Sequence, residues 1–217
     1  MQANRGQLLL SGSDDWPAQR GGSSRSASTL MFVLRPPKDL RLRMHQEAER
    51  HGQDQAAGSA CPAHLLHLSL LSLGRFDAPP KAIIARAKAA AASIEARPIP
   101  ITLDSSGFLG GKRQLALYPA KGNQRIVQFG EILGRSLRHH NLPGLVEKQP
   151  TPHVTVIHDS GTGDPMSIER NYAWIAGEFT LVFSHHEEAR QEEIGRWSLD
   201  PKAPPYAAPA EQLRMAV

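Results

Sequence analysis

The sequence contains a single cysteine, Cys61, among its 217 residues. One thiol cannot close a disulfide within the chain, and its neighbours Ala60 and Pro62 supply neither a second thiol nor a metal ligand. A disulfide-stapled secreted scaffold is therefore excluded, and we expect a reducing, cytoplasmic setting.

Long hydrophobic runs are absent too. No stretch of about 18 apolar residues occurs, which excludes a membrane-spanning helix. The N-terminal "QLLLSG" is too short for the apolar centre of a signal peptide, so we expect no export and no membrane partner. The formal charge of +4 and pI near 9.5 are compatible with an anionic ligand but do not demand one.

The remaining composition, with 40% hydrophobic residues, is that of a soluble globular protein with one domain or two small lobes. Residues 1–27 are rich in Ser, Gly, Arg and Asp without periodicity, which predicts a disordered extension. Residues 28–200 carry the periodic segments of a folded domain. Residues 201–217 are rich in Pro and Ala and predict a flexible tail.

Within the folded part, apolar alternation and proline boundaries predict both strands and helices. Helices are expected over 38–52, over the Ala-rich segment 79–96 and over the amphipathic segment 123–141, with Ile126, Phe129, Ile132 or Leu133, and Leu137 inward. Strands are expected over 29–36, 63–74, 98–110, 112–120, 151–159, 172–185 and 193–200. This order predicts an α+β domain whose halves echo each other, a duplicated two-lobe fold.

Two of these strands share a motif. "AHLLHLSLLSLG" (63–74) and "TPHVTVIHD" (151–159) each place a histidine in an alternating apolar run, with a hydroxyl residue two positions later. The pairs are His67 with Ser69 and His153 with Thr155. Alternation along a strand puts each histidine and its hydroxyl on the same face. In the first stretch, Leu71 is expected on that face as well, and Leu66, Leu68 and Leu70 on the other.

Two histidines that meet at one site can act as general base and general acid in the same reaction, because the pKa of an unperturbed imidazole lies near neutrality. The hydroxyls, roughly 7 Å further along each strand, are placed to hold a tetrahedral anion between the rings. Phosphate is the natural occupant. The two motifs therefore predict phosphate-ester chemistry at a site shared by both halves.

With these residues the chain resembles the two-histidine phosphoesterase superfamily, in particular the 2'-5' RNA ligases or RNA 2',3'-cyclic phosphodiesterases. "HLSLLSLG" is similar to the family's His-x-Thr-Leu-x-Phe-Leu-Gly stretch, and "TPHVTV" to its Pro-His-x-Thr-Leu stretch. The resemblance covers roughly residues 29–200. It implies antiparallel sheets that line a central cleft, with helices packed outside.

The resemblance also implies roles. His67 and His153 would be the catalytic acid and base, and Ser69 and Thr155 the substrate-binding hydroxyls, in hydrolysis of a 2',3'-cyclic phosphate or a 2'-5' phosphodiester. The family's typical 2'-phosphate product favours His67 as the acid and His153 as the base. The expected partner is an RNA 3' end or a cyclic nucleotide, with no metal or other cofactor, and a ligase activity is possible. We expect a monomer.

Three positions depart from the family pattern. Ser69 replaces the commoner Thr and so lacks the methyl group that restricts its rotamer. Thr151 and His158 stand where many members have Arg. We therefore expect the phosphate charge to be neutralised from elsewhere, and the candidates are Lys112, Arg113 and Lys148.

Other interpretations remain open at this point. A module of the same fold that binds RNA or a nucleotide without turnover is the main alternative, although binding alone needs no pair of imidazoles. The other histidines have no ligand spacing typical of a metal site. "GFLGGKR" (107–113) lacks the spacing of a phosphate-binding loop and predicts a hairpin turn. Aromatic side chains that could stack on a base, but more often serve as core, are Phe76, Phe108 and Trp174.

Overall fold

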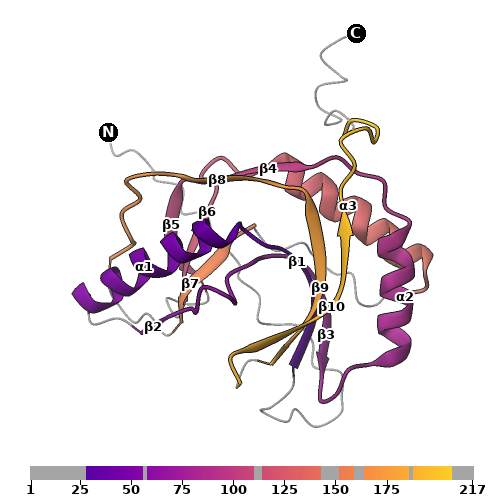
Figure 1. The fold of residues 1–217 in the computed structure, drawn as a ribbon, viewed down its shortest axis with the longest axis horizontal. Helices are drawn as coiled ribbons and strands as arrows, with labels where there is room; N and C mark the ends of the chain where they lie inside the picture. Colours follow the sequence, from indigo (N-terminus) through magenta and orange to yellow (C-terminus); the bar gives the residue numbers. More distant parts are fainter. Residues whose placement is uncertain are drawn as a thin grey trace, which may run out of the picture.

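The computed structural model in Figure 1 describes most of the chain between the two terminal segments. The described residues are 28–55, 58–109, 114–142, 152–158, 164–185 and 188–206. The predicted disordered extension 1–27 lies outside them, as do residues 207–217 of the predicted tail. Within the described part, no helix is long and apolar enough to cross a membrane.

The three helices lie where proline boundaries and periodicity predict them. α1 (Lys38–Asp54) begins directly after Pro37, and α2 (Lys81–Ala92) directly after Pro80. α3 (Gln124–His139) is capped by Asn123, whose side-chain oxygen accepts hydrogen bonds from two backbone N–H groups at 3.0 and 3.2 Å. The buried side of α3 contains Ile126, Phe129, Leu133 and Leu137. The sequence left open whether Ile132 or Leu133 points inward, and the buried residue is Leu133.

Ten strands are described. They are β1 (Ser28–Leu34), β2 (Ser59–Ala60), β3 (Leu68–Phe76), β4 (Ile99–Leu103), β5 (Ser105–Leu109), β6 (Gln114–Tyr118), β7 (Val154–His158), β8 (Tyr172–Ala176), β9 (Glu178–His185) and β10 (Arg190–Ser198). The short β2 was not predicted, because two paired residues carry no periodicity.

Two predicted strands each form two. The segment 98–110 divides into β4 and β5 at Asp104, and the segment 172–185 divides into β8 and β9 at Gly177. The physical reason is the same in both cases. β4 and β8 pair with each other in a two-stranded ladder, and after Asp104 and Gly177 the chain continues as β5 and β9, which belong to larger sheets. Asp104 stabilises its corner by accepting a 2.7 Å hydrogen bond from the Ala120 N–H.

The other strands form two antiparallel sheets of four. The first has the order β10-β9-β1-β3 and the second the order β2-β7-β6-β5. α1 contacts the second sheet through β2 and β7, while α2 and α3 pack together against the first sheet (Figure 1). The α+β class with antiparallel sheets is thus confirmed, whereas the division into two lobes stays a prediction.

The core is continuous across both sheets, since one cluster of buried side chains includes Phe32 of the first sheet and Leu117 of the second. On the α3 side of the first sheet, Phe179 lies with its ring centroid 5.1 Å from that of Phe129 and 6.0 Å from that of Phe32. A separate small cluster lies on the opposite face of this sheet and consists of Met31, Val33 and Val182.

Candidate active site

The four predicted site residues occupy equivalent places in the two sheets. His67 immediately precedes β3 and His153 immediately precedes β7, while Ser69 and Thr155 are each the second residue of their strand. All four side chains are partly exposed, in contrast to the buried residues between them, Leu68 and Val154. The motif repeated in the sequence is therefore also repeated in the local structure.

Both motif strands contain a β-bulge at the same point. In the β1–β3 ladder Val33 pairs with Ser69 and Phe32 with Leu71, so that Leu70 has no opposite residue. In the β6–β7 ladder Ala116 pairs with Thr155 and Leu115 with Ile157, so that Val156 has none. Each bulge follows directly on the hydroxyl residue. Bulges redirect side chains and are common beside active sites.

The first bulge corrects one prediction. Paired residues of an antiparallel ladder share a face, so Ser69 lies on the face of Val33, away from α3. Leu71 pairs with Phe32 and lies on the α3 face instead. The expectation that Leu71 shares a face with Ser69 is wrong, because the extra residue of the bulge reverses the alternation that a regular strand would continue.

The two motif strands approach each other although they belong to different sheets. β3 contacts β7. In addition, the chain runs to His67 directly from the end of β2, and β2 pairs with β7. The Cys61 N–H donates a 2.8 Å hydrogen bond to the carbonyl of Val156, the bulged residue of β7. The start of β3 is therefore tied to the second motif through a short stretch of backbone.

His67 follows a turn formed by residues 62–65, in which the Leu65 N–H donates to the Pro62 carbonyl. Its ring nitrogen Nδ1 lies 2.6 Å from the Leu65 carbonyl oxygen and 3.1 Å from the side-chain nitrogen of Gln191 on β10. The Ser69 hydroxyl lies 3.8 Å from the sulfur of Met31.

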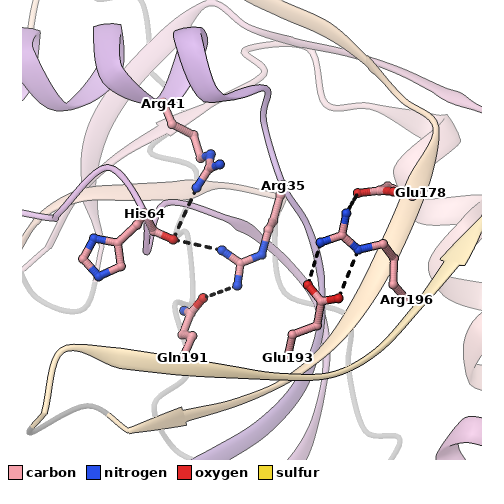
Figure 2. A network of polar contacts seen from close by, with 7 residues as sticks. All are labelled: Arg35, Arg41, His64, Glu178, Gln191, Glu193 and Arg196. Atoms are coloured by element: carbon pink, nitrogen blue, oxygen red, sulfur yellow. Dashed lines mark hydrogen bonds and ion pairs between the residues drawn. The ribbon is translucent and has the colours of Figure 1, made fainter.

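Two arginines hold this turn (Figure 2). Arg35 donates from Nη1 to the His64 carbonyl at 3.0 Å and from Nη2 to the Gln191 side-chain oxygen at 2.8 Å. Arg41 of α1 donates to the His64 carbonyl at 3.3 Å. It also donates to the Ala63 carbonyl, again at 3.3 Å. The sequence analysis did not identify Arg35, Arg41 or Gln191 as residues of the site. The one local signal was the position of Arg35, a charged residue directly between a buried strand and Pro36.

A pocket of about 280 Å³ opens beside this network. Arg35, Arg41 and Arg196 line it together with Trp174 and the start of α1, but none of the four predicted site residues is among its described lining. Its arginines are largely engaged by protein acceptors: Arg196 bonds Glu178 at 2.9 Å and Glu193 at 2.7 Å. The pocket therefore adjoins the candidate site without forming it.

The charges of the network influence one another. Burial lowers the pKa of the Arg35 guanidinium, the positive charge of Arg41 lowers it further, and the carboxylate of Glu193 raises it. The hydrogen bond from Arg196 lowers the pKa of the Glu193 carboxyl. Arginine stays protonated over the accessible pH range, so Arg35 contributes a permanent positive charge and donor-only nitrogens.

Four of the other described histidines have a ring nitrogen within hydrogen-bond distance of a protein group. His45 bonds the Cys61 carbonyl, His51 the Asp164 carbonyl, His140 the Ser136 carbonyl and His185 the Ser28 hydroxyl. Within the described residues no group of three or more His, Cys, Asp or Glu side chains is arranged to hold a metal ion.

The predicted neutralising cations Lys112, Arg113 and Lys148 lie outside the described residues, as does Thr151. His158 is exposed at the end of β7, opposite Ser59 and Gln114. Of the aromatic candidates, Trp174 is 8% exposed, and Phe76 and Phe108 are partly buried against the core. The structure thus favours the core interpretation for these three side chains.

Comparison with known proteins agrees with this architecture. The family model of the 2'-5' RNA ligase superfamily matches residues 36–182. E. coli LigT complexed with 3'-AMP is similar in structure, with a TM-score of 0.67 and 22% identity over 80% of this chain and 98% of LigT. TT0787 of Thermus thermophilus has a TM-score of 0.63 and 19% identity over 80% of this chain and 99% of its own. A search of curated proteins found no match.

Because the family model spans well over half of the sequence, the chain belongs to the 2'-5' RNA ligase superfamily, whose members are two-histidine phosphoesterases. The solved structures show that the fold is that of LigT and related phosphoesterases.

Proposed function

We propose that the protein is a metal-independent phosphodiesterase that opens 2',3'-cyclic phosphates, or cleaves 2'-5' phosphodiesters, at RNA ends or in nucleotides. One observation carries the proposal. The His-x-Ser/Thr motif occurs twice, each time with the histidine just before a strand and a bulge just after the hydroxyl, on two strands that contact each other. Two imidazoles and two hydroxyls are the groups that general acid–base chemistry on a phosphate ester uses, and stability alone does not require this combination.

In the proposed reaction His153 takes a proton from water, whose oxygen forms a new bond to phosphorus. The bond from phosphorus to the ribose 3' oxygen breaks, and His67 gives that oxygen a proton, which yields a 2'-phosphate. Ser69 and Thr155 donate hydrogen bonds to the phosphoryl oxygens, on which negative charge accumulates. The histidines end with exchanged protonation states, and proton exchange with solvent restores them.

The contact of His67 with Leu65 fits this role. A carbonyl oxygen only accepts, so Nδ1 must carry the proton in a 2.6 Å hydrogen bond. Proton transfer to or from substrate is then assigned to Nε2, and the Leu65 bond is kept in both protonation states. For the substrate class, the structures of E. coli LigT with 3'-AMP and with phosphate support a nucleotide phosphate ligand.

The test is phosphorus NMR of a nucleoside 2',3'-cyclic phosphate, and of a short RNA that ends in one, incubated with the protein in EDTA. We expect ring opening by wild type and its loss in His67→Ala and His153→Ala. A 2'-phosphate product assigns His67 as acid, and a 3'-phosphate reverses the roles. Ligand binding by folded wild type without turnover of either compound would instead support the binding module.

A further inference from the structure

Among the described residues, two neighbours of the His67 Nδ1 atom have opposite requirements. The Leu65 carbonyl at 2.6 Å requires a proton on Nδ1, whereas the amide nitrogen of Gln191 at 3.1 Å is a donor and would require a lone pair there. A neutral ring can satisfy only one of them. The tautomer of His67 therefore depends on how firmly each neighbour is held.

Arg35 holds both neighbours. Its Nη1 donates to the carbonyl of His64, in the turn that carries Leu65, and its Nη2 donates to the side-chain oxygen of Gln191. Because a guanidinium can only donate, it also decides how the Gln191 amide is turned, with the oxygen towards Arg35 and the nitrogen towards His67. Figure 2 shows the guanidinium of Arg35 between the His64 carbonyl and Gln191.

The distances decide between the two tautomers. A lone pair on Nδ1 would face the lone pairs of the Leu65 oxygen at 2.6 Å, which is strongly repulsive, while an N–H there forms a short hydrogen bond. The contact with the Gln191 nitrogen is longer, at 3.1 Å, so the donor–donor repulsion that it brings when Nδ1 is protonated is weaker than the repulsion avoided at the Leu65 oxygen. The turn thus selects the tautomer, and Gln191 supports the edge of the ring.

We propose that Arg35 is a positioning residue for His67: its bond to the His64 carbonyl holds the turn whose Leu65 carbonyl keeps the proton of the neutral ring on Nδ1, and its bond to Gln191 fixes the side chain beside the ring. The inference rests on the catalytic role proposed for His67. Arg41 donates to the same carbonyl at a longer distance and assists. The device depends on the forked shape of the guanidinium, since the single ammonium group of lysine does not reproduce its planar pair of donors.

The direct test is the tautomer itself, read from side-chain ¹⁵N chemical shifts of the ligand-free full chain labelled at histidine, with the His67 signals assigned by their loss in His67→Gln. In wild type we expect a protonated Nδ1 and a lone pair on Nε2. In Arg35→Met and Arg35→Lys the shifts should move towards a mixture of tautomers. Gln191→Leu should keep the proton on Nδ1, because the turn remains held.

A matched control is Arg196→Met. Arg196 lines the same pocket and bonds only carboxylates among its described contacts, so its loss should leave the His67 shifts unchanged. If Arg35→Met leaves the tautomer unchanged, or if Gln191→Leu moves the proton to Nε2, the bridging role of Arg35 is wrong.

Kinetics give the second test, with the cyclic nucleotide as substrate. A misplaced catalytic group costs about 10²-fold, so Arg35→Met and Arg35→Lys should lower kcat by about that factor with little change in KM. A rise in KM at unchanged kcat would mean that Arg35 binds substrate instead. Full rescue by Arg35→Lys would mean that charge alone matters, and would also overturn the inference.

Failure of this inference can be told apart from failure of the proposed function. The tautomer is measured without substrate, so it is informative even if wild type turns over no phosphodiester. Conversely, if wild type is active and His67→Ala is not, an unchanged kcat in Arg35→Met counts against Arg35 alone.

Discussion

The two motifs have the same sequence pattern but different surroundings. β3, which follows His67, is an edge strand with β1 as its ladder partner, whereas β7, which follows His153, lies between β2 and β6. His67 comes from a turn that is held by two arginine side chains and flanked by Gln191. The ring of His67, before the edge strand, is thus held by a local backbone carbonyl and by side chains from outside β3, whereas β7 is paired with β6 along its length and with β2 at its far end.

The comparison is tested most strongly by removing each histidine. Loss of a general acid or base typically costs 10²–10⁴-fold, so His67→Ala and His153→Ala should each lower kcat by about that factor. Because the two act in one proton-transfer sequence, the double variant should be little worse than the weaker single one. Initial rates of cyclic-phosphate opening measure this. Independent, multiplying losses would show that the motifs do not work as a unit.

The hydroxyls should have the next largest effect. A hydrogen bond to a charged group contributes about 1.5–3 kcal/mol, so Ser69→Ala and Thr155→Ala should each lower kcat/KM by about 10–100-fold. We expect the larger loss for Thr155, whose methyl group restricts its rotamer. Ser69→Thr, which makes the two motifs alike, is the matched control and should retain activity. If both alanine variants were as active as wild type, the two hydroxyls would have no part in binding the phosphoryl group.

Cys61 connects the two regions and gives a pH test. Burial raises the pKa of its thiol from about 9 to about 11. Between these values the unfolded chain loses the proton before the folded chain does, so the free energy of unfolding falls as pH rises from about 9 to 11. The loss should be of the order of 1–3 kcal/mol.

Urea unfolding of wild type and Cys61→Ala across this pH range measures that slope, which should be weaker in the variant. A wild-type slope equal to that of Cys61→Ala would show that the thiol ionises as readily in the folded chain as in the unfolded one.

The smallest effect is expected for Arg41→Met. Arg41 donates to the turn at 3.3 Å, and the shorter bond of Arg35 to the same His64 carbonyl remains in the variant. A hydrogen bond from a charged donor contributes about 1.5–3 kcal/mol, but this one is long and the Arg35 bond still holds the turn, so kcat should fall by no more than about fivefold. Steady-state kinetics of Arg41→Met and Arg35→Met, measured side by side, show which variant loses more kcat. A larger loss for Arg41→Met would reverse the order of importance within the network.

Local sequence patterns were sufficient for much of the fold. Pro37 and Pro80 mark the starts of α1 and α2, and the apolar spacing of Phe129 and Leu137 identifies the buried face of α3. Period-two alternation located the motif strands. These features depend on residues within one or two turns of each other, where propensity and periodicity act directly.

The bulges, the exchange of partner at Asp104 and Gly177, and the short β2 were not predictable in this way. Each depends on which strand lies alongside, and single-strand alternation contains no information on an extra residue in a ladder. For that reason Leu71 was expected on the wrong face.

The sequence by itself determined the family, the helices and the two His-x-Ser/Thr motifs, because these depend on residue type and local spacing. Only the tertiary structure brought β3 beside β7 and placed Arg35 and Gln191 around His67, although Gln191 lies 124 residues away along the chain. Such contacts depend on the packing of two sheets around one core. Donor and acceptor geometry at a single ring nitrogen is decided by that packing and not by the local sequence.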